Sequence, residues 1–508
     1  MRRELPPFRN LREFITHLEG AGQVVRVREP VSVVHEMTEI HRRVLRDDGP
    51  ALIFERPVKA SGAVSDMPLV TNLFGTTERV AWGLGIRPDS VAALGEAFAE
   101  MREPRPPRGL ADAWSKIPLA KAALSMQPRT LSSAPAQSVR WTGGDIDLGR
   151  LPIQLPWPGE PAPLITWPLV FTRPLEYSAS DEGNIGVYRI QTLGRDRAIL
   201  RWLAHRGGAR HHRQWQARGR EMPVAIAIGA DPATILAAVL PLPETLSELK
   251  FSGVLRGARP EVVACLTVPL SVPAEAEIVI EGMVSPTETA PEGPYGDHTG
   301  YYNSVEDFPV MRITAITMRK DPLYLSTFTG RPPDEPSRIG EVFNRLFTPL
   351  ARRQFPEIVD LWLPPEACSY RIAVVSIDKR YPGQARRLML GLWSMLPQMT
   401  YTKLLIVVDA DIDVRDWADV MWAVSTRSDS SRDLLVLTDT PIDYLDFASP
   451  KPGLGGKLGI DATNKIGPET DRLWGQALAM DPEVVVRADA ILSRLGLSKT
   501  REIRKAGP

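Results

Sequence analysis

Residues 370–377 read Tyr-Arg-Ile-Ala-Val-Val-Ser-Ile, and residues 403–408 read Lys-Leu-Leu-Ile-Val-Val. Both are short apolar runs rich in β-branched residues, as in buried strands, and a helical pattern near 383–396 separates them. A second helix near 414–425 and a third strand near 433–437 continue the alternation. Strands that alternate with helices favour right-handed βαβ crossovers. The last third of the chain is therefore predicted to be an α/β domain with a largely parallel sheet.

The middle third has a different pattern, in which short β-branched segments follow one another with turn residues between them. Such a series predicts the strands of an antiparallel sheet or barrel. The segments are 167–172, 186–192, 197–203, 223–228, 261–269, 275–281 and 309–317. Helical patterns at 231–240 and 244–254 are inserted among them. We therefore expect a mainly β domain in this part of the chain.

The first third predicts an α/β domain that begins with a capped helix. Asn10 can accept a hydrogen bond from the first helical turn. The apolar residues that follow it keep helical spacing: Leu11, Phe14, Ile15 and Leu18. A strand is predicted over 24–27 and a further helix near 89–102. The breaker-rich connection at 103–109 is expected to close this domain, between residues 103 and 135.

These patterns divide the chain into three domains, as expected for 508 residues, which exceed one ordinary core. We predict an N-terminal α/β domain over 1–125, a central β domain over 126–332 and a C-terminal α/β domain over 333–508. The fold class is thus mixed α/β and α+β. A terminal helix near 481–495 has an apolar face, which must pack on its own domain or against another subunit.

Composition excludes several classes of protein. Lys and Arg together number 61, as do Asp and Glu, so no net charge recruits nucleic acid and none is predicted as a partner. Two cysteines, Cys265 and Cys368, are too few for a disulfide framework or a cysteine zinc site, which suits a reducing cytoplasm. No uncharged apolar run approaches the roughly 18 residues that span a bilayer, and the N-terminus lacks the apolar core of a signal peptide. A cytoplasmic location is therefore expected.

The run Pro291-Glu-Gly-Pro-Tyr-Gly-Asp-His-Thr-Gly-Tyr-Tyr302 carries the most distinctive chemistry. Two carboxylates, Glu292 and Asp297, lie five positions apart, and the glycines and proline between them forbid a regular helix. We expect both acids on a shaped loop, where paired carboxylates in different surroundings can become a proton donor and a partner that stays charged. The alternative is a polar turn whose acids cap neighbouring backbone groups.

Two segments combine cations with glycines: Asn184-Ile-Gly-Val-Tyr-Arg189 and Arg201-Trp-Leu-Ala-His-Arg-Gly-Gly208. Glycine lets a ligand approach the backbone, and Arg201 and Arg206 can pair with phosphate oxygens. A phosphate site is one interpretation of this pattern. The other is a strand pair with a tight turn and arginines that face solvent.

One amide, one imidazole and one carboxylate could together bind a hard divalent cation such as Mg²⁺ or Mn²⁺, with room for phosphate and water. These are the side chains of Asn184, His205 and Glu248. Their spacing matches no local metal motif. Without further information, a helical turn in Leu246-Ser-Glu-Leu-Lys250 explains Glu248 better than a metal site does.

Two other motifs imitate ligand sites. Asp409, Asp411 and Asp413 resemble the start of a calcium loop, but valines occupy the positions where glycine and glutamate are required, so the motif fails. Asp413 is instead predicted to cap the helix that follows. The run 453–459 is rich in glycine and could form a nest around a phosphate, with Lys457 as the counter-charge.

Taken together, these segments resemble the UbiD carboxy-lyase family, decarboxylases that use prenylated FMN. The resemblance runs from about residue 9 to residue 495 and looks closest to the bacterial 3-polyprenyl-4-hydroxybenzoate decarboxylases. It implies that the central domain is a split β-barrel that binds the flavin. The matching motifs are Asn184-Ile-Gly-Val-Tyr-Arg189, Arg201-Trp-Leu-Ala-His-Arg-Gly-Gly208, Leu246-Ser-Glu248, Glu292-Gly-Pro-Tyr-Gly-Asp-His-Thr-Gly300, Thr329-Gly-Arg-Pro-Pro-Asp-Glu-Pro336, Leu363-Pro-Pro-Glu-Ala-Cys-Ser-Tyr-Arg371, Pro441-Ile-Asp-Tyr-Leu-Asp-Phe-Ala-Ser-Pro450 and Asp461-Ala-Thr-Asn-Lys465.

The resemblance implies a role for each matching residue. The catalytic Arg–carboxylate–carboxylate set matches Arg189, Glu292 and Asp297. The metal ligands match Asn184 and Glu248, and His205 stands near a third ligand found in some members. The flavin-binding positions match Val187, Tyr188, Arg189, Arg201, Trp202, Leu203, Arg206 and Gly207, and Lys457 resembles a lysine near the flavin phosphate.

The implied reaction is decarboxylation of 3-polyprenyl-4-hydroxybenzoate to a 2-polyprenylphenol in ubiquinone biosynthesis. The modified flavin takes up the electrons that CO₂ leaves behind, and Asp297 protonates the same carbon. That role needs a carboxyl that is protonated near neutral pH, and we expect burial and Glu292 to raise the pKa of Asp297 accordingly. Cinnamate-type members carry Glu at this position, so the Asp favours phenolic substrates.

The resemblance also implies Mn²⁺ or Mg²⁺ as metal, with K⁺ as a further ion, and a flavin prenyltransferase as cofactor supplier. It implies a homo-oligomer built from dimers, up to a hexamer, through the terminal helix. A prenylated substrate suggests peripheral contact with the inner face of the cell membrane.

Two alternatives remain open at this point. The chain could act on another phenolic or aromatic acid, or it could be a non-catalytic flavin-binding scaffold of a quinone-biosynthesis assembly. An ordinary FMN oxidoreductase would need a nicotinamide site, and the sequence shows no fingerprint for one.

Overall fold

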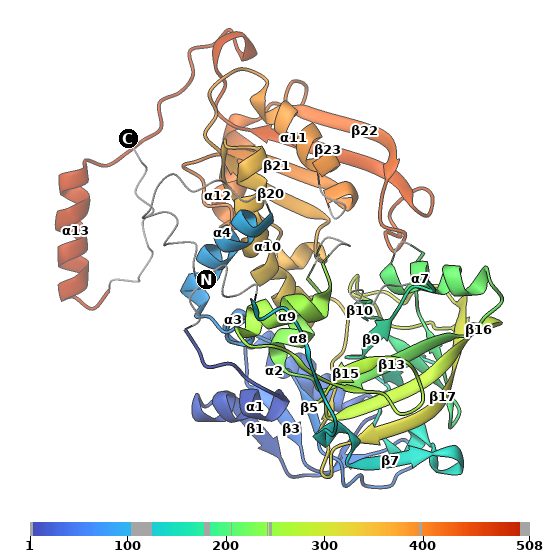
Figure 1. Cartoon of the computed structure of the whole chain (residues 1–508). Coiled ribbons are helices and arrows are strands. Elements are labelled where there is room, and N and C mark those ends of the chain that lie inside the picture. Colours follow the sequence, from blue (N-terminus) through green and yellow to red (C-terminus); the bar gives the residue numbers. More distant parts are fainter. Residues whose placement is uncertain are drawn as a thin grey trace. The chain divides into compact units, whose positions relative to one another are not determined.

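The computed structural model describes residues 4–102, 124–176, 183–204, 206–240, 242, 246–395 and 399–497. The chain divides into two compact units (Figure 1). Unit 1 comprises Met1–Leu350 and Pro365–Ser369, and unit 2 comprises Ala351–Pro364 and Tyr370–Pro508.

Unit 1 is organised around a nine-stranded sheet in the order β10-β9-β13-β16-β17-β12-β11-β8, with β7 paired to β17. Every pair in this sheet is antiparallel, which confirms the prediction for most of the middle third. The exception is 261–269, whose strand lies in a separate three-stranded sheet that contains a parallel pair. Its strands are β7 (Val139–Thr142), β8 (Leu164–Ile165), β9 (Leu169–Thr172), β10 (Asn184–Val187), β11 (Ile190–Leu193), β12 (Arg197–Leu200), β13 (Met222–Ile228), β16 (Ile278–Glu292) and β17 (Glu306–Met318). Register shifts between β16 and β17 curve the two longest strands, and the sheet forms a half-barrel.

Helices lie against this sheet and between its strands (Figure 1). They are α7 (Gly207–Gln216), α8 (Pro232–Ala237) and α9 (Glu248–Arg256). A small sheet of β6 (Arg129–Leu131), β14 (Glu261–Ala264) and β15 (Ser271–Pro273) adjoins them. The predicted helices at 231–240 and 244–254 are therefore present but shorter.

The N-terminal part of unit 1 has a four-stranded sheet in the order β1-β3-β5-β18. Asn10 caps α1, because its side-chain oxygen accepts a hydrogen bond from the N–H of Glu13 at 3.0 Å. This confirms the predicted cap. The elements are α1 (Leu11–Gly20), β1 (Val24–Val27), β2 (Val31–Ser32), α2 (Glu36–Arg46), β3 (Ala51–Phe54), β4 (Pro57–Val58), β5 (Leu69–Thr71), α3 (Thr77–Gly83), α4 (Val91–Arg102), β18 (Tyr324–Leu325) and α10 (Glu335–Gln354), which reaches into unit 2.

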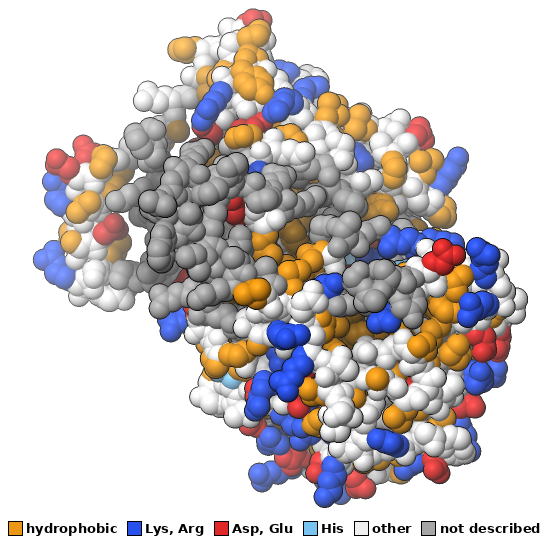
Figure 2. Space-filling model, viewed as in Figure 1, with side chains coloured by type: hydrophobic (Ala, Val, Ile, Leu, Met, Phe, Trp, Pro, Cys, Tyr) orange, Lys and Arg blue, Asp and Glu red, His pale blue; other side chains and the backbone are white. Residues whose placement is uncertain are grey.

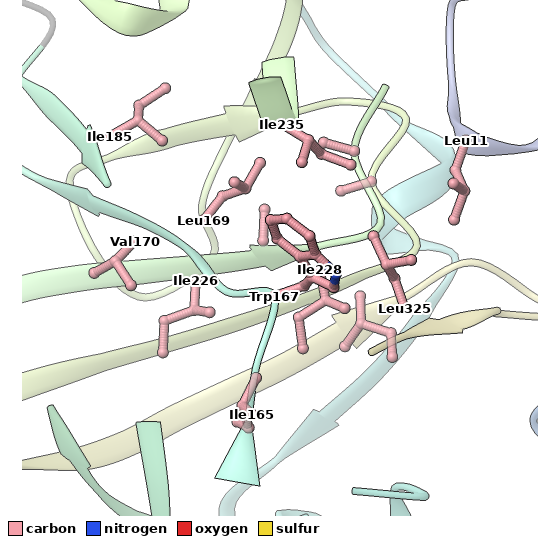
Figure 3. Close-up of a cluster of buried hydrophobic side chains, with 14 of the residues drawn as sticks. Leu11, Ile165, Trp167, Leu169, Val170, Ile185, Ile226, Ile228, Ile235 and Leu325 are labelled. Atoms are coloured by element: carbon pink, nitrogen blue, oxygen red, sulfur yellow. The ribbon is translucent and has the colours of Figure 1, made fainter. Parts of the chain in front are cut away.

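One apolar core joins the nine-stranded and the four-stranded sheets of unit 1. Figure 3 shows Leu325 of β18 beside Trp167 and Ile228 of β13, with Leu11 of α1 and Ile226 of β13 farther out on opposite sides. All five side chains are at least 96 % buried. Burying each such side chain stabilises the fold by about 1.5–3 kcal/mol. The central sheet is therefore a rigid support for groups at its ends.

Unit 2 has a five-stranded sheet in the order β19-β20-β21-β23-β22. The three inner strands are parallel and the two edge strands antiparallel, which confirms a largely parallel sheet. Successive residues of β21 enter different cores, since Val407 packs with Leu388 of α11 and Val408 with Val420 of α12. The elements are β19 (Ile358–Trp362), β20 (Ile372–Ile377), α11 (Gln384–Met395), β21 (Leu404–Asp409), α12 (Trp417–Arg427), β22 (Leu434–Pro441), β23 (Leu454–Ala462) and α13 (Pro482–Arg494).

Three local predictions are wrong. Glu292 is the last residue of β16, so it lies on a strand and only Asp297 lies on the loop. Helix α12 begins at Trp417, and its cap is Asp416, which accepts from the N–H of Ala418, in place of Asp413. The glycine-rich run at 453–459 does not form a nest, because most of it is strand β23, paired on both sides.

The terminal helix α13 has no buried residue. Its apolar face therefore does not pack on the rest of the described chain, and the prediction that it contacts another subunit stays open. In the part of the chain that the structure describes, no helix combines the length and apolar character needed to cross a membrane.

Candidate active site

Arg189 lies between β10 and β11 and binds both acids of the distinctive run. Its Nε and Nη2 atoms donate to the two oxygens of Glu292 at 2.8 and 3.1 Å, and Nη1 donates to Oδ2 of Asp297 at 3.2 Å. Glu292 is fully buried, and the other two side chains are 14 % exposed. The three residues predicted as catalytic are thus one hydrogen-bonded group, although more than 100 positions separate Arg189 from the acids.

Two further residues fix this group. Arg201, directly after β12, donates to Oε2 of Glu292 at 3.1 Å, so the buried carboxylate has a guanidinium on each side. Asn303 accepts from Nη2 of Arg189 at 2.7 Å and from the N–H of Tyr295 at 2.9 Å. Charge-assisted bonds of this kind stabilise Glu292 as an anion. The sequence predicted Arg201 only as a flavin residue and missed Asn303.

Asp297 has two different neighbours on its two oxygens. Oδ2 faces Arg189, while Oδ1 accepts from the N–H of His298 at 2.7 Å and from its Nδ1 at 2.6 Å. Burial raises the pKa of this carboxyl, but His298 and Arg189 outweigh burial and lower the pKa of Asp297 to about 2. The prediction of a protonated Asp297 is therefore wrong, because the adjacent imidazole and the guanidinium of Arg189 stabilise the carboxylate.

A tight turn supports the Asp297 loop from behind. Glu160 accepts from the N–H of Gly296 at 3.1 Å and from the N–H of Trp157 at 3.0 Å, and the indole of Trp157 donates to the carbonyl of Thr329 at 2.8 Å. Burial raises the pKa of Glu160 to about 7. Sequence reasoning missed this residue, although an acid that ends the turn Trp157-Pro-Gly-Glu160 in an apolar, proline-rich stretch was a usable signal.

A second cluster lies where α7 and α9 begin. Glu248, the first residue of α9, accepts from the N–H of Ile185 at 3.0 Å, next to Asn184 at the start of β10. The hydroxyl of Tyr188 accepts from Nδ2 of Asn184 at 3.2 Å and from the N–H of Gly208 at 3.3 Å. The structure thus brings Asn184, Glu248 and Tyr188 to the first turn of α7. His205 lies outside the described residues.

This cluster fits an anionic group and a hard cation. A side chain at Gly207 would meet Oδ1 of Asn184 at 2.2 Å, so only glycine leaves room there. Trp202 Nε1 and Ser247 Oγ are buried with no hydrogen-bond partner among the described residues. Burial raises the pKa of Glu248, as expected for a carboxylate that lacks a cation. The helix N-terminus, with Arg206 as the N-cap residue, suits a phosphate, and the two oxygen donors suit Mg²⁺ or Mn²⁺.

The remaining residues predicted to bind the flavin belong partly to unit 1 and partly to unit 2. Trp202 and Leu203 line an open cavity of about 320 Å³ together with Phe308, and Val187 ends β10 beside Tyr188. Figure 2 shows basic side chains gathered over α7. Lys457 belongs to unit 2, where it is buried and donates to the carbonyls of Thr400, Thr402 and Pro441, and burial lowers its pKa to about 8.

In the described ranges, no group of three or more His, Cys, Asp and Glu side chains is placed to hold a metal. The candidate metal site therefore rests on the amide of Asn184 and the carboxylate of Glu248.

Three family models match consecutive parts of the chain. They are the N-terminal, Rift-related and C-terminal domains of 3-octaprenyl-4-hydroxybenzoate carboxy-lyase, over residues 15–98, 129–332 and 337–462. The chain belongs to the UbiD family. This confirms the resemblance, and it identifies the half-barrel as the Rift-related domain of a UbiD carboxy-lyase.

Solved structures of the UbiD class agree over nearly the whole chain. The enzyme HmfF from Pelotomaculum thermopropionicum, in complex with FMN, is 28 % identical, with coverage of 94 % of this chain and 98 % of that chain and a TM-score of 0.77. Vanillic acid decarboxylase from Sedimentibacter hydroxybenzoicus is 26 % identical, with coverage of 96 % and 99 % and a TM-score of 0.80. A 3,4-dihydroxybenzoic acid decarboxylase from Klebsiella pneumoniae, 21 % identical over 95 % and 99 %, shares the fold at a TM-score of 0.75.

Proposed function

We propose that this UbiD carboxy-lyase removes CO₂ from an aromatic acid, with prenylated FMN as cofactor. The observation that supports this most directly is the group in which Arg189 binds Glu292 and Asp297. One cation, one buried anion and one partly accessible carboxyl can orient an acid substrate and return a proton to it.

Loss of CO₂ from a benzoate leaves an electron pair in the ring plane, where resonance cannot spread it. The bound flavin supplies the electron sink that no side chain provides. The protein's own residues bind the substrate and handle the proton. Arg189 has a guanidinium suited to a carboxylate, and its bonds to two acids keep it in place. Glu292 serves as the anionic partner of Arg189 and Arg201. Asp297, whose pKa is lowered, must first take up a proton, which it then donates in place of CO₂.

The cluster at the start of α7 is proposed to hold the flavin phosphate and a divalent cation. Gly207, Arg206 and the first turn of α7 would bind the phosphate, and Asn184 with Glu248 would ligate Mn²⁺ or Mg²⁺. The ion would have a structural role, because it would offset the charge of the phosphate and of the buried Glu248. Lys457, His205 and K⁺ remain predictions for this site.

The substrate is proposed to be a phenolic acid. The similar enzymes include decarboxylases of vanillic and 3,4-dihydroxybenzoic acids. The finer proposal is 3-polyprenyl-4-hydroxybenzoate, which would give a 2-polyprenylphenol for ubiquinone biosynthesis. We also propose a flavin prenyltransferase as cofactor supplier, a homo-oligomer, and peripheral membrane contact through a prenylated substrate.

The test is production of the protein with and without a flavin prenyltransferase, followed by assay of CO₂ release. The panel contains 3-polyprenyl-4-hydroxybenzoate, vanillate, 3,4-dihydroxybenzoate and cinnamate. We expect turnover of a phenolic acid only after co-production with the prenyltransferase. Asp297→Asn should retain the flavin absorbance and lose about 10²–10⁴-fold in kcat. Retained flavin with no CO₂ release from any acid would instead support the scaffold alternative.

The metal assignment has its own test. Glu248→Ala should lower the content of flavin and metal in the purified protein, while Asp297→Asn should leave both unchanged. Full retention of flavin and metal by Glu248→Ala would remove Glu248 as a ligand.

A further inference from the structure

Three backbone N–H groups just before Asp297 donate to side chains outside this segment of the loop. The acceptors are Gln191, Asn303 and Glu160, which bind the N–H groups of Gly293, Tyr295 and Gly296 at 3.0, 2.9 and 3.1 Å respectively. Gln191 and Asn303 have neutral amides, so their bonds do not change with pH. Glu160 is the ionisable acceptor of this set, and it binds the residue directly before Asp297.

Glu160 joins the Asp297 loop to the turn that begins at Trp157. Its Oε1 accepts from Gly296 and its Oε2 accepts from the N–H of Trp157 at 3.0 Å, so each carboxyl oxygen has one donor. The two segments are also in close contact, because a Cβ at Gly296 would lie 2.3 Å from the indole of Trp157. A change in either bond would therefore act directly on the residue before the proposed proton donor.

Both bonds should be stronger when Glu160 is ionised. A carboxylate makes charge-assisted bonds through both oxygens, whereas one oxygen of the acid is a hydroxyl and accepts more weakly. Burial raises the pKa of Glu160 to about 7, and the N–H groups of Trp157 and Gly296 act against burial. A bond that lowers a pKa is stronger with the deprotonated form, by linkage. Glu160 should therefore hold the loop more firmly above pH 7 than below it.

The charged groups near Glu160 act on its ionisation in opposite directions. The ionisable side chains on the segments that pack against it are those of Arg189, Glu292, Tyr295, Asp297 and His298. Beyond burial, Arg189 lowers the pKa of Glu160 and Glu292 raises it. Tyr295 stays a neutral phenol, because burial and the charges of Glu160 and Glu292 raise the pKa of its hydroxyl. Glu160 is 7 % exposed, so it equilibrates with solvent, and none of its protons has to move during a turnover.

We propose that Glu160 is a positioning residue, whose carboxylate holds the Asp297 loop in the geometry that proton delivery requires. This inference rests on the proposed function. A displacement of about 1 Å in a reacting group can cost about 100-fold in rate, so a loosened loop should lower kcat. KM should change little, because Arg189, which orients the substrate, is held separately by Glu292.

The first test needs no flavin. In cofactor-free protein, hydrogen–deuterium exchange of peptides that cover residues 293–300 is compared between wild type and Glu160→Gln. Gln has the shape of the protonated acid, so the variant should fold, but its side chain keeps only one acceptor oxygen. We expect exchange about tenfold faster than in wild type at pH 8 and equal to it at pH 6.

Glu288→Gln is the matched control for the exchange experiment, because Glu288 also lies on β16 but is about half exposed and pairs with Arg197. It should exchange like the wild type at both pH values. Equal exchange of wild type and Glu160→Gln at pH 8 would show that the charge of Glu160 does not hold the loop, and would overturn the proposal.

The second test separates the charge of Glu160 from simple support of the loop. In flavin-loaded enzyme, the readout is the ratio of wild-type kcat to that of Glu160→Gln from pH 6 to pH 8, which cancels the ionisation that both proteins share. The ratio should rise from about 1 to about 10, while KM stays unchanged. Gln191→Leu is the control, because it removes a neutral acceptor from the same loop and its deficit should not vary with pH. A ratio that is constant with pH would overturn the proposal.

The failures of the two proposals are distinguishable. If the flavin-loaded wild type releases no CO₂ from any acid in the panel, the proposed function fails, and the exchange experiment still decides whether the charge of Glu160 holds the loop. If the wild type is active and the kcat ratio is constant with pH, only the positioning role of Glu160 fails.

Discussion

Arg189 donates hydrogen bonds to both carboxylates of the catalytic group, Glu292 and Asp297. We expect Arg189→Lys to keep the charge but lose the paired bonds to Glu292, because an ammonium cannot bind both oxygens in one plane. CO₂ release should fall at least about 100-fold, and the free energy of unfolding should fall by about 3 kcal/mol, since Glu292 is fully buried. Both quantities are measured by activity assay and by urea denaturation.

The matched control is Arg197→Lys. Arg197 binds Glu288 at 2.8 Å, but both side chains are about half exposed. Surface pairs contribute about 0–1 kcal/mol. Equal losses in Arg189→Lys and Arg197→Lys would show that burial of Glu292 does not set the energetics of the pair.

Glu160 predicts a pH dependence of stability. Its folded-state pKa of about 7 is above the ordinary value of 4.5, so the folded protein holds a proton that the unfolded chain releases. Stability should therefore fall as pH rises from about 4.5 to 7, by about 3 kcal/mol in total. Glu160→Gln cannot ionise and should lack this contribution.

The measurement is the difference in unfolding free energy between wild type and Glu160→Gln across this pH range. Taking this difference cancels the pH dependence that other groups contribute equally to both proteins. One such group is Glu335, whose pKa burial also raises to about 7. A difference that is constant with pH would mean that Glu160 is ionised in the fold.

The sequence located the acids and Arg189 but not the residues that tune them. The motif carries Glu292 and Asp297 with their chemistry, and the family resemblance supplied Arg189. Glu160 and Asn303 were missed because each acts through a contact with a residue far away in the sequence, over 136 and 114 positions respectively. The pKa of Asp297 was predicted in the wrong direction, since His298 occurs next to it in the sequence but its ring position is set only by the folded loop.

At the scale of elements, the Asp297 loop depends on close packing against the Trp157 turn. A Cβ at Gly296 would lie 2.3 Å from the indole of Trp157, whose position is fixed by its bond to Thr329. Gly296→Ala should therefore displace the loop, cost about 1–3 kcal/mol of stability and reduce turnover. Thermal unfolding and CO₂ release measure the two effects.

Gly340 offers the control for this substitution. It lies within α10, and a Cβ there meets nothing within 4 Å. Gly340→Ala should stabilise the protein by about 0.5–1 kcal/mol, since alanine favours a helix. If Gly296→Ala behaves like Gly340→Ala, the loop tolerates movement and the packing argument is wrong.

The periodicity of apolar residues predicted which segments are helices and which are strands, but it did not predict where each one begins and ends. The alternation of strands and helices in the last third and the antiparallel series in the middle are confirmed, because apolar spacing reports which face is buried. The end of β16 was misplaced, since pairing with β17 carries the strand through to Glu292 despite the prolines. Asp413 and Asp416 are equally good caps by composition, and only the start of α12 distinguishes them.

At the scale of the whole molecule, helix α13 has an apolar face that no other described part of the chain covers. Ile491 and Leu492 on one face of this helix, and the C-cap residue Leu495 on the same face, are 41–63 % exposed. An amphipathic helix with an exposed apolar face indicates a protein contact, and homo-oligomers are the commonest way to cover one. We expect the wild type to be an oligomer, and Ile491→Asp with Leu495→Asp to give a smaller species by sedimentation equilibrium.

Arg487→Ser is the control on the same helix, because this side chain is 68 % exposed and its ion pair with Glu483 spans 4.0 Å. It should leave the mass unchanged, since a charge on the solvent face of the helix contributes little to association. If the double variant keeps the wild-type mass, α13 does not hold the subunits together, and another surface must do so. If the wild type is itself a monomer, the apolar face of α13 has some other partner, and the prediction of a homo-oligomer is wrong.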